Sequence, residues 1–302
     1  DLCAAPGGKS TLIQSIISAA SLLVSNEVIK TRVHILAENI TKWGAANVIV
    51  TNNDPSDFQR LPGYFDVIVV DAPCSGSGLF RKDPAAIEEW SENNVLHCAQ
   101  RQQRILEHVM PALKDGGILI YSTCSYSKEE DEAIADWMVE QSAVGSLQLA
   151  VHDDWGIVET VSEKEKAYSY RFYPDKVKGE GFFIAAFKKA TPGNNINNEF
   201  TPPTTVQKSK KKTAVFTPKE IEILKSYLID GDDYFFIKQN EEVIAMPLHL
   251  EKELPVIQSA LYIKKAGVKL GTLIRNELIP DHELAVSNII NDSIPRLDIE
   301  KE

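Results

Sequence analysis

Residues 1–11, D-L-C-A-A-P-G-G-K-S-T, decide how the rest of the chain is interpreted. Leu2 has the character of a strand end, residues 5–8 that of a tight turn, and residues 10–19 that of a helix. Residues 8–10 match the end of the phosphate-binding pattern G-x-x-x-x-G-K-[ST], but Cys3 stands where that pattern requires its first glycine. We therefore reject a nucleoside-triphosphate loop and predict a glycine turn that faces a different ligand.

The composition is that of an ordinary globular protein. The chain has 302 residues, of which 43% are hydrophobic and 25% charged, enough for one large or two smaller domains. A net charge of -11 argues against a protein that wraps duplex nucleic acid through bulk charge. The four cysteines lack C-x-x-C spacing and do not cluster with the histidines, so we predict no metal. Free thiols and the lack of an apolar run of membrane-spanning length indicate a cytoplasmic protein.

Strand and helix patterns alternate over residues 1–190. We expect strands at residues 22–25, 47–51, 65–71, 117–123 and 182–187, and helices at 10–19, 29–41, 94–113 and 128–141. This order predicts an α/β fold with a doubly wound, mostly parallel sheet. In such sheets the ligand lies outside the carboxyl ends of the strands, so motifs at strand ends are the candidates for chemistry.

The remaining chain is predicted to form a linker and a small second module. Residues 191–214 are polar and proline-bearing, and four of their lysines either touch RNA phosphates or are merely solvated: Lys208, Lys210, Lys211 and Lys212. Residues 215–302 are expected to be an α+β accessory module that binds RNA. It begins with a capping box at residues 217–220, followed by a hairpin of residues 234–238 and 243–246. A second hairpin is expected from residues 261–263 and 269–274, around Gly267.

Two acids follow strands where a bound adenosine would need them. Glu27 comes just after the second strand, the place of an acid that bonds a ribose hydroxyl. Asp54 follows the third strand and is placed to meet an adenine amine. Either acid alone is equally explained as a cap of the next helix or turn. Together with the glycine turn they favour a cofactor that carries adenosine.

Two further motifs carry thiols at strand ends. Cys74 lies in Asp71-Ala72-Pro73-Cys74 after a buried apolar strand. Cys124 directly follows the predicted strand of residues 117–123. The first, fourth and fifth strands are neighbours at the centre of this fold. We therefore expect Lys9, Asp71, Cys74 and Cys124 to converge on one pocket. Cys98, on a helix, is interpreted as ordinary packing.

A thiolate beside a methyl donor suits methylation of a carbon that is not itself nucleophilic. In a pyrimidine, thiolate attack at C6 makes C5 nucleophilic enough to take a methyl group. A hydrogen bond to N3 of the base, from Asp71, would help this attack. A second thiol suits breakdown or release of the adduct.

The motifs resemble those of the Nop/Sun family of RNA cytosine-5 methyltransferases. The likeness covers residues 1–190 and rests on residues 3–9, 71–76 and 122–124, with further signatures at 81–84 and 100–102. It implies a class I, Rossmann-like domain that uses S-adenosyl-L-methionine, with Cys124 as nucleophile, Cys74 assisting release, and Asp71 and Lys9 orienting the cytosine. The residues expected to bind the cofactor are Cys3, Ala4, Ala5, Pro6, Gly7, Gly8, Lys9, Glu27, Arg32, Asp54 and Asp71.

The second module extends the resemblance to bacterial 16S ribosomal RNA enzymes of the RsmF type, through residues 267–273 and 280–285. Those relatives begin before the first glycine motif and often end with a further domain, so we expect both modules to be truncated here. We also expect the protein to be a monomer. Four cations are candidate phosphate ligands, or a merely solvated face: Arg81, Lys82, Arg101 and Arg104. Transfer RNA is the alternative substrate, and a catalytically silent RNA-binding assembly factor is the alternative class of protein. A nicotinamide dehydrogenase is disfavoured because G-x-G-x-x-G is missing.

Overall fold

The computed structural model describes residues 1–191, 216–239 and 241–294. The chain divides into two compact units, each described here by itself. The first unit comprises Asp1–Cys3 and Asp54–Thr201, and the second Ala4–Asn53 and Pro202–Glu302. The predicted domain limits, 1–190 and 215–302, stay a prediction. All but the first residue of the predicted linker, including its four lysines, lies outside the described residues.

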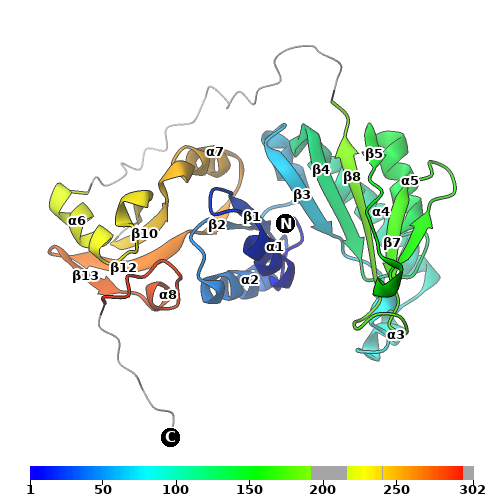
Figure 1. The fold of residues 1–302 in the computed structure, drawn as a ribbon, viewed down its shortest axis with the longest axis horizontal. Coiled ribbons are helices and arrows are strands. Elements are labelled where there is room, and N and C mark those ends of the chain that lie inside the picture. Colours follow the sequence, from blue (N-terminus) through cyan, green and yellow to red (C-terminus); the bar gives the residue numbers. More distant parts are fainter. Residues whose placement is uncertain (192–215, 240, 295–302) are drawn as a thin grey trace, which may run out of the picture. The chain divides into compact units, whose positions relative to one another are not determined.

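The first unit is built on a six-stranded sheet, coloured cyan to yellow-green in Figure 1. Its order is β3 (Phe65–Asp71), β4 (Leu113–Thr123), β8 (Phe182–Lys189), β7 (Tyr168–Phe172) and β6 (Val158–Val161), with β5 (Val144–Ser146) paired to β8. Strands β3 and β4 are parallel, and the pairs beyond β4 are antiparallel. The backbone N–H of Leu2 donates to Val69 O of β3 at 2.9 Å, although Leu2 itself is not part of a strand.

Three α-helices accompany this sheet: α3 (Ala85–Glu89), α4 (Glu92–Val109) and α5 (Glu132–Gln141). Short 3-10 turns complete the unit at Pro55–Arg60, Ser77–Leu79, Met110–Ala112 and Asp153–Trp155. Ser91 caps α4, because its hydroxyl accepts the Asn94 N–H at 3.1 Å. Helix α5 begins four residues later than predicted, since Glu130 and Asp131 precede it with completely buried side chains.

The second unit contains a three-stranded sheet of β1 (Leu23–Asn26), β2 (Val48–Thr51) and β11 (Ile263–Ala266). Strands β1 and β2 are parallel, while β11 runs antiparallel to β2. Helices α1 (Gly8–Ile16) and α2 (Lys30–Trp43) belong to the same unit. Val33, Leu36 and Ile40 form one face of α2 and pack in a core with Val48 and Val50 of β2.

A four-stranded antiparallel sheet forms the rest of the second unit, drawn in yellow to orange-red in Figure 1. Its order is β13 (Glu277–Pro280), β12 (Val268–Ile274), β10 (Glu242–Pro247) and β9 (Tyr234–Gln239). Helices α6 (Pro218–Ser226), α7 (Glu253–Ala260) and α8 (His282–Ala285) accompany it, with 3-10 turns at Gly231–Asp233 and Leu248–Leu250. The predicted capping box of α6 is confirmed, because Thr217 and Glu220 bond each other reciprocally, and so is the hairpin of β9 and β10.

The second predicted hairpin is wrong. Strand β11 pairs with β2, whereas β12 pairs with β10 and β13. Gly267, between them, has φ +53° and donates its N–H to Val48 O at 3.1 Å. A β-carbon there would collide with Ala245 O, so glycine lets the chain turn from one sheet into the other. The α/β class itself is confirmed.

Within the described residues, no helix combines the length and the apolar character needed to cross a bilayer. In the same part of the chain, no three side chains of His, Cys, Asp or Glu gather as ligands for a metal ion.

Candidate functional site

The two predicted thiols meet in the first unit. Strands β3 and β4 place Asp71 beside Ser122, and the chain continues from each strand into a cysteine-bearing loop. The Sγ atoms of Cys74 and Cys124 lie 2.9 Å apart, and both side chains are half-buried. The hydrogen bond with Cys124, burial, and the charge of Cys124 raise the pKa of the Cys74 thiol above its ordinary value. Burial and the contact with Cys124 therefore favour the protonated thiol at Cys74.

Backbone contacts hold these two loops against each other. The Gly78 N–H donates to Cys124 O at 2.8 Å, and the Gly181 N–H donates to Gly78 O at 2.9 Å. A β-carbon on Gly78 would stand 2.5 Å from Gly181 O and 2.7 Å from Cys124 O. Only glycine fits this crossing, which explains in physical terms why the first loop carries Gly78.

A buried carboxylate, Glu130, joins both loops. Its Oε2 accepts hydrogen bonds from the hydroxyls of Ser75 and Ser125, the latter at 2.7 Å. Its Oε1 accepts the Ser75 N–H at 2.8 Å and the Gln102 side-chain N–H at 3.0 Å. Ser75 follows Cys74 and Ser125 follows Cys124, so Glu130 contacts the residue next to each thiol.

The neighbouring carboxylate, Asp131, supports the other side of Cys124. Its Oδ1 accepts the Thr123 hydroxyl at 2.7 Å, and its Oδ2 lies 3.0 Å from Arg171 Nη2. Arg171 also donates to both carboxylate oxygens of Glu132. Burial raises the pKa of Asp131 to about 8, although the hydrogen bond from Thr123 and the charge of Arg171 oppose it. Thr123 and Ser125, on either side of Cys124, are thus each fixed by a buried acid.

Asp71 lies at the end of β3, where the sequence predicted it. Its Oδ1 accepts the Ser122 hydroxyl at 2.8 Å, and its side chain is part-exposed. The Ala72 N–H donates to Ser122 O at 2.8 Å, which continues the pairing of β3 and β4 past the strand ends. Asp71 and the two thiols therefore belong to loops that begin at the same sheet edge.

The glycine turn and Glu27 lie in the second unit. The turn is held by Arg32, which donates to Ala5 O at 2.7 Å, and by Asn39, which donates to Pro6 O at 2.8 Å. Gly7 has φ +116° and precedes α1, and a β-carbon on Gly8 would meet no atom within 4 Å. The turn thus leaves open space beside a helix N-terminus.

The two carboxylate oxygens of Glu27 have different surroundings. Glu27 is only 3% exposed, and its Oε1 accepts the Ile29 N–H at 2.9 Å. Among the described residues its buried Oε2 has no hydrogen-bond partner, although Arg32 Nη1 lies 3.5 Å away. A buried acceptor without a donor fits a ligand hydroxyl such as that of a ribose, and so this half-site suits the predicted cofactor.

Other predicted residues have local roles in the structure. Asp54 Oδ1 accepts the N–H and the hydroxyl of Ser56 at 3.0 and 2.7 Å, and these bonds lower the pKa of Asp54. This is the capping alternative, and contact with adenine stays a prediction.

Among the four predicted phosphate ligands, Arg81 pairs with Glu180 at 3.0 Å, whereas Lys82, Arg101 and Arg104 are exposed. Cys3 is half-buried in the first unit, and Cys98 contacts Asn94 on its own helix at 3.8 Å. The predicted convergence of Lys9 with the thiols stays a prediction, because Lys9 belongs to the second unit.

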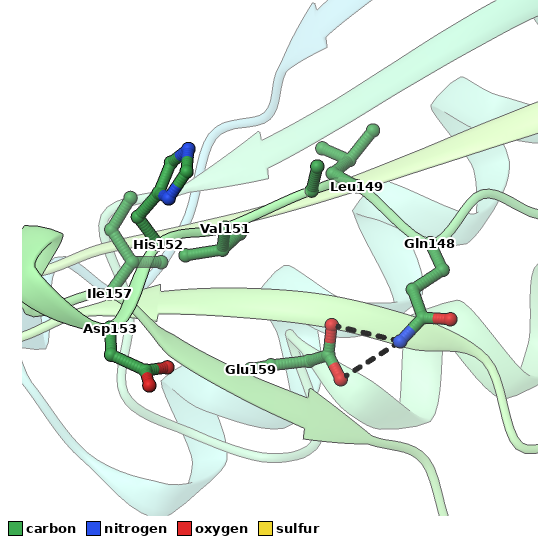
Figure 2. Close-up of a pocket in the computed structure, with 8 residues that line it drawn as sticks. Gln148, Leu149, Val151, His152, Asp153, Ile157 and Glu159 are labelled. Atoms are coloured by element: carbon green, nitrogen blue, oxygen red, sulfur yellow. Dashed lines mark hydrogen bonds between the residues drawn. The ribbon is translucent and has the colours of Figure 1, made fainter.

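A pocket of about 590 Å³ lies elsewhere in the first unit, around residues 148–159. Figure 2 shows the Gln148 amide directed at the Glu159 carboxylate, with N–O distances of 3.3 and 3.4 Å, and His152 and Asp153 at the other end. None of the residues predicted for the site lines this pocket.

Sequence reasoning missed Glu130, Asp131 and Arg171 as parts of the site, and it noted Gln102 only within the signature at residues 100–102. The run K-E-E-D-E at residues 128–132 resembles an ordinary acidic helix start. Its position a few residues after Cys124 was the one available signal that these acids turn inward.

Comparisons with known proteins identify relatives of this chain. The family model described as "16S rRNA methyltransferase RsmB/F" matches residues 1–188. The protein named ribosomal RNA small subunit methyltransferase F from Vibrio vulnificus (strain YJ016) is 30% identical, over 100% of this chain and 63% of its own length. Its namesake from Aliivibrio fischeri (strain MJ11) is 33% identical over 90% of this chain and 56% of its own length. The chain thus spans about three-fifths of the length of these relatives.

Solved structures with the same fold cover slightly less than two-thirds of the chain. PH0851 matches with a TM-score of 0.56 and 27% identity, over 63% of this chain and 42% of its own. NSun6 from Pyrococcus horikoshii, solved with SFG, matches with a TM-score of 0.52 and 27% identity, over 63% of this chain and 47% of its own.

Proposed function

We propose, from the premise that this chain belongs to the 16S rRNA methyltransferase RsmB/F family, that it methylates C5 of cytosine in small-subunit ribosomal RNA. The observation that carries the proposal is the pair of thiols at the ends of adjacent parallel strands, with Sγ atoms 2.9 Å apart. A cysteine nucleophile with a second thiol beside it suits addition to a pyrimidine and later elimination.

The reaction begins with the thiolate of Cys124. Its attack forms a bond from Sγ to C6 of the base, and the ring electrons shift so that C5 becomes nucleophilic. In its protonated form the Asp71 carboxyl donates a hydrogen bond to N3 and so stabilises the negative charge that builds on the ring. C5 accepts a methyl group and then gives its proton to a base, for which a water molecule suffices. The electrons of the C5–H bond restore the double bond between C5 and C6 as the Cys124 thiolate leaves.

Cys74 is suited to the release step. Its raised pKa keeps it protonated, and it lies within hydrogen-bond distance of the sulfur that must leave. An S–H donor beside a departing thiolate stabilises the developing charge. Without this donor the covalent RNA adduct should persist.

S-adenosyl-L-methionine would supply the methyl group as a sulfonium. The residues suited to hold it are the glycine turn, with open space at Gly8, and Glu27, whose Oε2 has no hydrogen-bond partner among the described residues. The NSun6 relative was solved with SFG, an analogue of this cofactor, which supports the same choice here. Lys9, next to the turn, is proposed to orient the cytosine. A cytoplasmic location fits relatives named for ribosomal RNA.

The test uses the full-length protein with labelled cofactor, 16S ribosomal RNA and, separately, transfer RNA, with bisulfite sequencing to map the product. Cys124→Ala should abolish methylcytidine, Cys74→Ala should accumulate an RNA–protein adduct, and Cys98→Ala should behave as the wild type. Normal methylation by Cys124→Ala would show that the nucleophile is wrongly assigned. Product in transfer RNA alone would change the substrate, and a wild type silent on both RNAs would favour an assembly factor.

A further inference from the structure

The acid at position 130 has an unusual environment. Its carboxylate is completely buried and accepts four hydrogen bonds, and all four donors are neutral groups. Two hydroxyls and two N–H groups all contact its two oxygens. A buried carboxyl group is a costly way to fill space, because its removal from water must be offset by hydrogen bonds of this kind. Packing alone does not explain a glutamate here.

The donors come from three separate segments. Ser75 belongs to the loop of Cys74, Ser125 to the loop of Cys124, and Gln102 to helix α4. One oxygen, Oε2, accepts the hydroxyls of both serines, and so it bridges the two loops directly. Gln102 also donates to Pro73 O at 3.0 Å, which fixes the residue before Cys74 to the same network.

We propose that Glu130 is a positioning residue that sets the separation of Cys74 and Cys124. The proposal rests on the proposed function, in which one thiol attacks and the other assists the departure of the first. Glu130 acts through Ser75 and Ser125, each adjacent to a cysteine in sequence. A displacement of reacting groups by about 1 Å can lower a reaction rate on the order of a hundredfold. The hydrogen bonds from Ser75 and Ser125 to Glu130 should therefore affect the rate of the reaction at the two thiols.

Glu130→Gln is the informative variant, because it keeps the shape of the side chain and replaces one acceptor oxygen by an NH2 group. The Ser75 N–H can only donate, and the NH2 group of Gln102 already donates to both Glu130 Oε1 and Pro73 O, so the new amide oxygen must face these donors. The new NH2 group then takes the place of Oε2, and the two hydroxyls lose the acceptor that they share. Glu129→Gln is the matched control, since Glu129 is the preceding residue in the chain and is exposed.

The first measurement does not depend on methylation. Full-length protein is treated with a diazene oxidant, diamide, and the Cys74–Cys124 disulfide is followed by peptide mass spectrometry. Two thiols lose two protons and two electrons to form the disulfide, while the diazene is reduced to the hydrazine. Glu130→Gln should slow this disulfide about tenfold, and Glu129→Gln should leave its rate unchanged.

The second measurement is steady-state methylation. Glu130→Gln should lower kcat by about tenfold to a hundredfold and leave KM for RNA within about twofold, since substrate-binding groups are untouched. Ser125→Ala removes one donor with little change of shape and should shift both readouts in the same direction. It therefore serves as the test if Glu130→Gln fails to fold. In the Glu130→Gln background, Ser125→Ala should add little, because both act through one link.

A wild-type disulfide rate and a wild-type kcat in Glu130→Gln or Ser125→Ala would overturn the proposal. A wild-type protein that methylates no RNA would instead overturn the proposed function. In that case a slower disulfide in Glu130→Gln would still support positioning of the thiols by Glu130.

Discussion

Arg171 Nη2 lies 3.0 Å from Asp131 Oδ2, and the two side chains are 6% and 0% exposed. The same guanidinium bonds Glu132, so one cation lies between two acidic side chains. Despite its burial, Glu132 has a pKa held below the ordinary value by the hydrogen bond and charge of Arg171. Burial raises the pKa of Asp131 instead. Arg171 therefore balances the charge of Glu132, and Asp131 keeps its proton well above the usual range for an aspartate.

This assignment predicts that the contribution of Asp131 to the free energy of unfolding falls as the pH rises. Asp131 has a pKa of 3.8 when unfolded and about 8 when folded, so between these values the native state binds more protons than the unfolded state. The contribution of the Asp131 proton to the free energy of unfolding is fully present below about pH 4 and is lost as the pH rises through about 8. Urea unfolding of the full-length protein across this range should show the decline.

Asp131→Asn is the control for the pH dependence. The amide still accepts the Thr123 hydroxyl through its oxygen but does not titrate. The variant should flatten the decline in the free energy of unfolding between pH 4 and 8. An equally steep decline in Asp131→Asn would mean that another group titrates.

Removal of Arg171 should be strongly destabilising. Arg171→Met keeps much of the side-chain volume but leaves the Glu132 carboxylate without its buried cation, at a cost of about 3–5 kcal/mol in the free energy of unfolding. The matched control is Lys128→Met, because Lys128 pairs with Glu163 on the surface, with side chains 77% and 86% exposed. That pair is screened by water and should contribute almost nothing. Equal losses in the two variants would contradict a structural role for the Arg171 pair.

The crossing of the two thiol loops gives a third prediction. In Gly78→Ala the new β-carbon would stand 2.5 and 2.7 Å from two backbone oxygens, of Gly181 and Cys124, neither of which is a flexible side-chain end. The loops must move apart, at a cost of about 1–3 kcal/mol. Gly145→Ala, on β5, is the control because its β-carbon would meet no atom within 4 Å. Thermal unfolding and the diamide-driven disulfide rate should both change in Gly78→Ala and neither in Gly145→Ala.

The strands and the thiol pair were predictable because their signals are local or topological. Strand β3 has the bounds expected from its apolar run, and the closeness of Cys74 and Cys124 follows from adjacent parallel strands. Glu130 and Asp131 were not predicted, since a charged run does not by itself show which of its acids turn inward. The hairpin around Gly267 failed for a related reason. A strand pattern does not specify its partner, and β11 finds its partner in β2, more than two hundred residues earlier.

The last prediction concerns the cofactor half-site. Glu27 Oε1 is occupied by the Ile29 N–H, whereas Oε2 is buried and has no hydrogen-bond partner in the described part of the chain. If a ribose hydroxyl donates to Oε2, Glu27→Ala should lose about 1.5–3 kcal/mol of binding, a hydrogen bond to a charged group, and so raise the Kd for S-adenosyl-L-methionine roughly tenfold to a hundredfold. Calorimetric titration of the full-length protein measures this directly. Glu38→Ala is the control. Glu38 lies on the exposed face of α2, and its one ion pair within the described residues is with Lys42. Unchanged affinity in a folded Glu27→Ala would place the cofactor elsewhere, and the buried Oε2 would then need another donor.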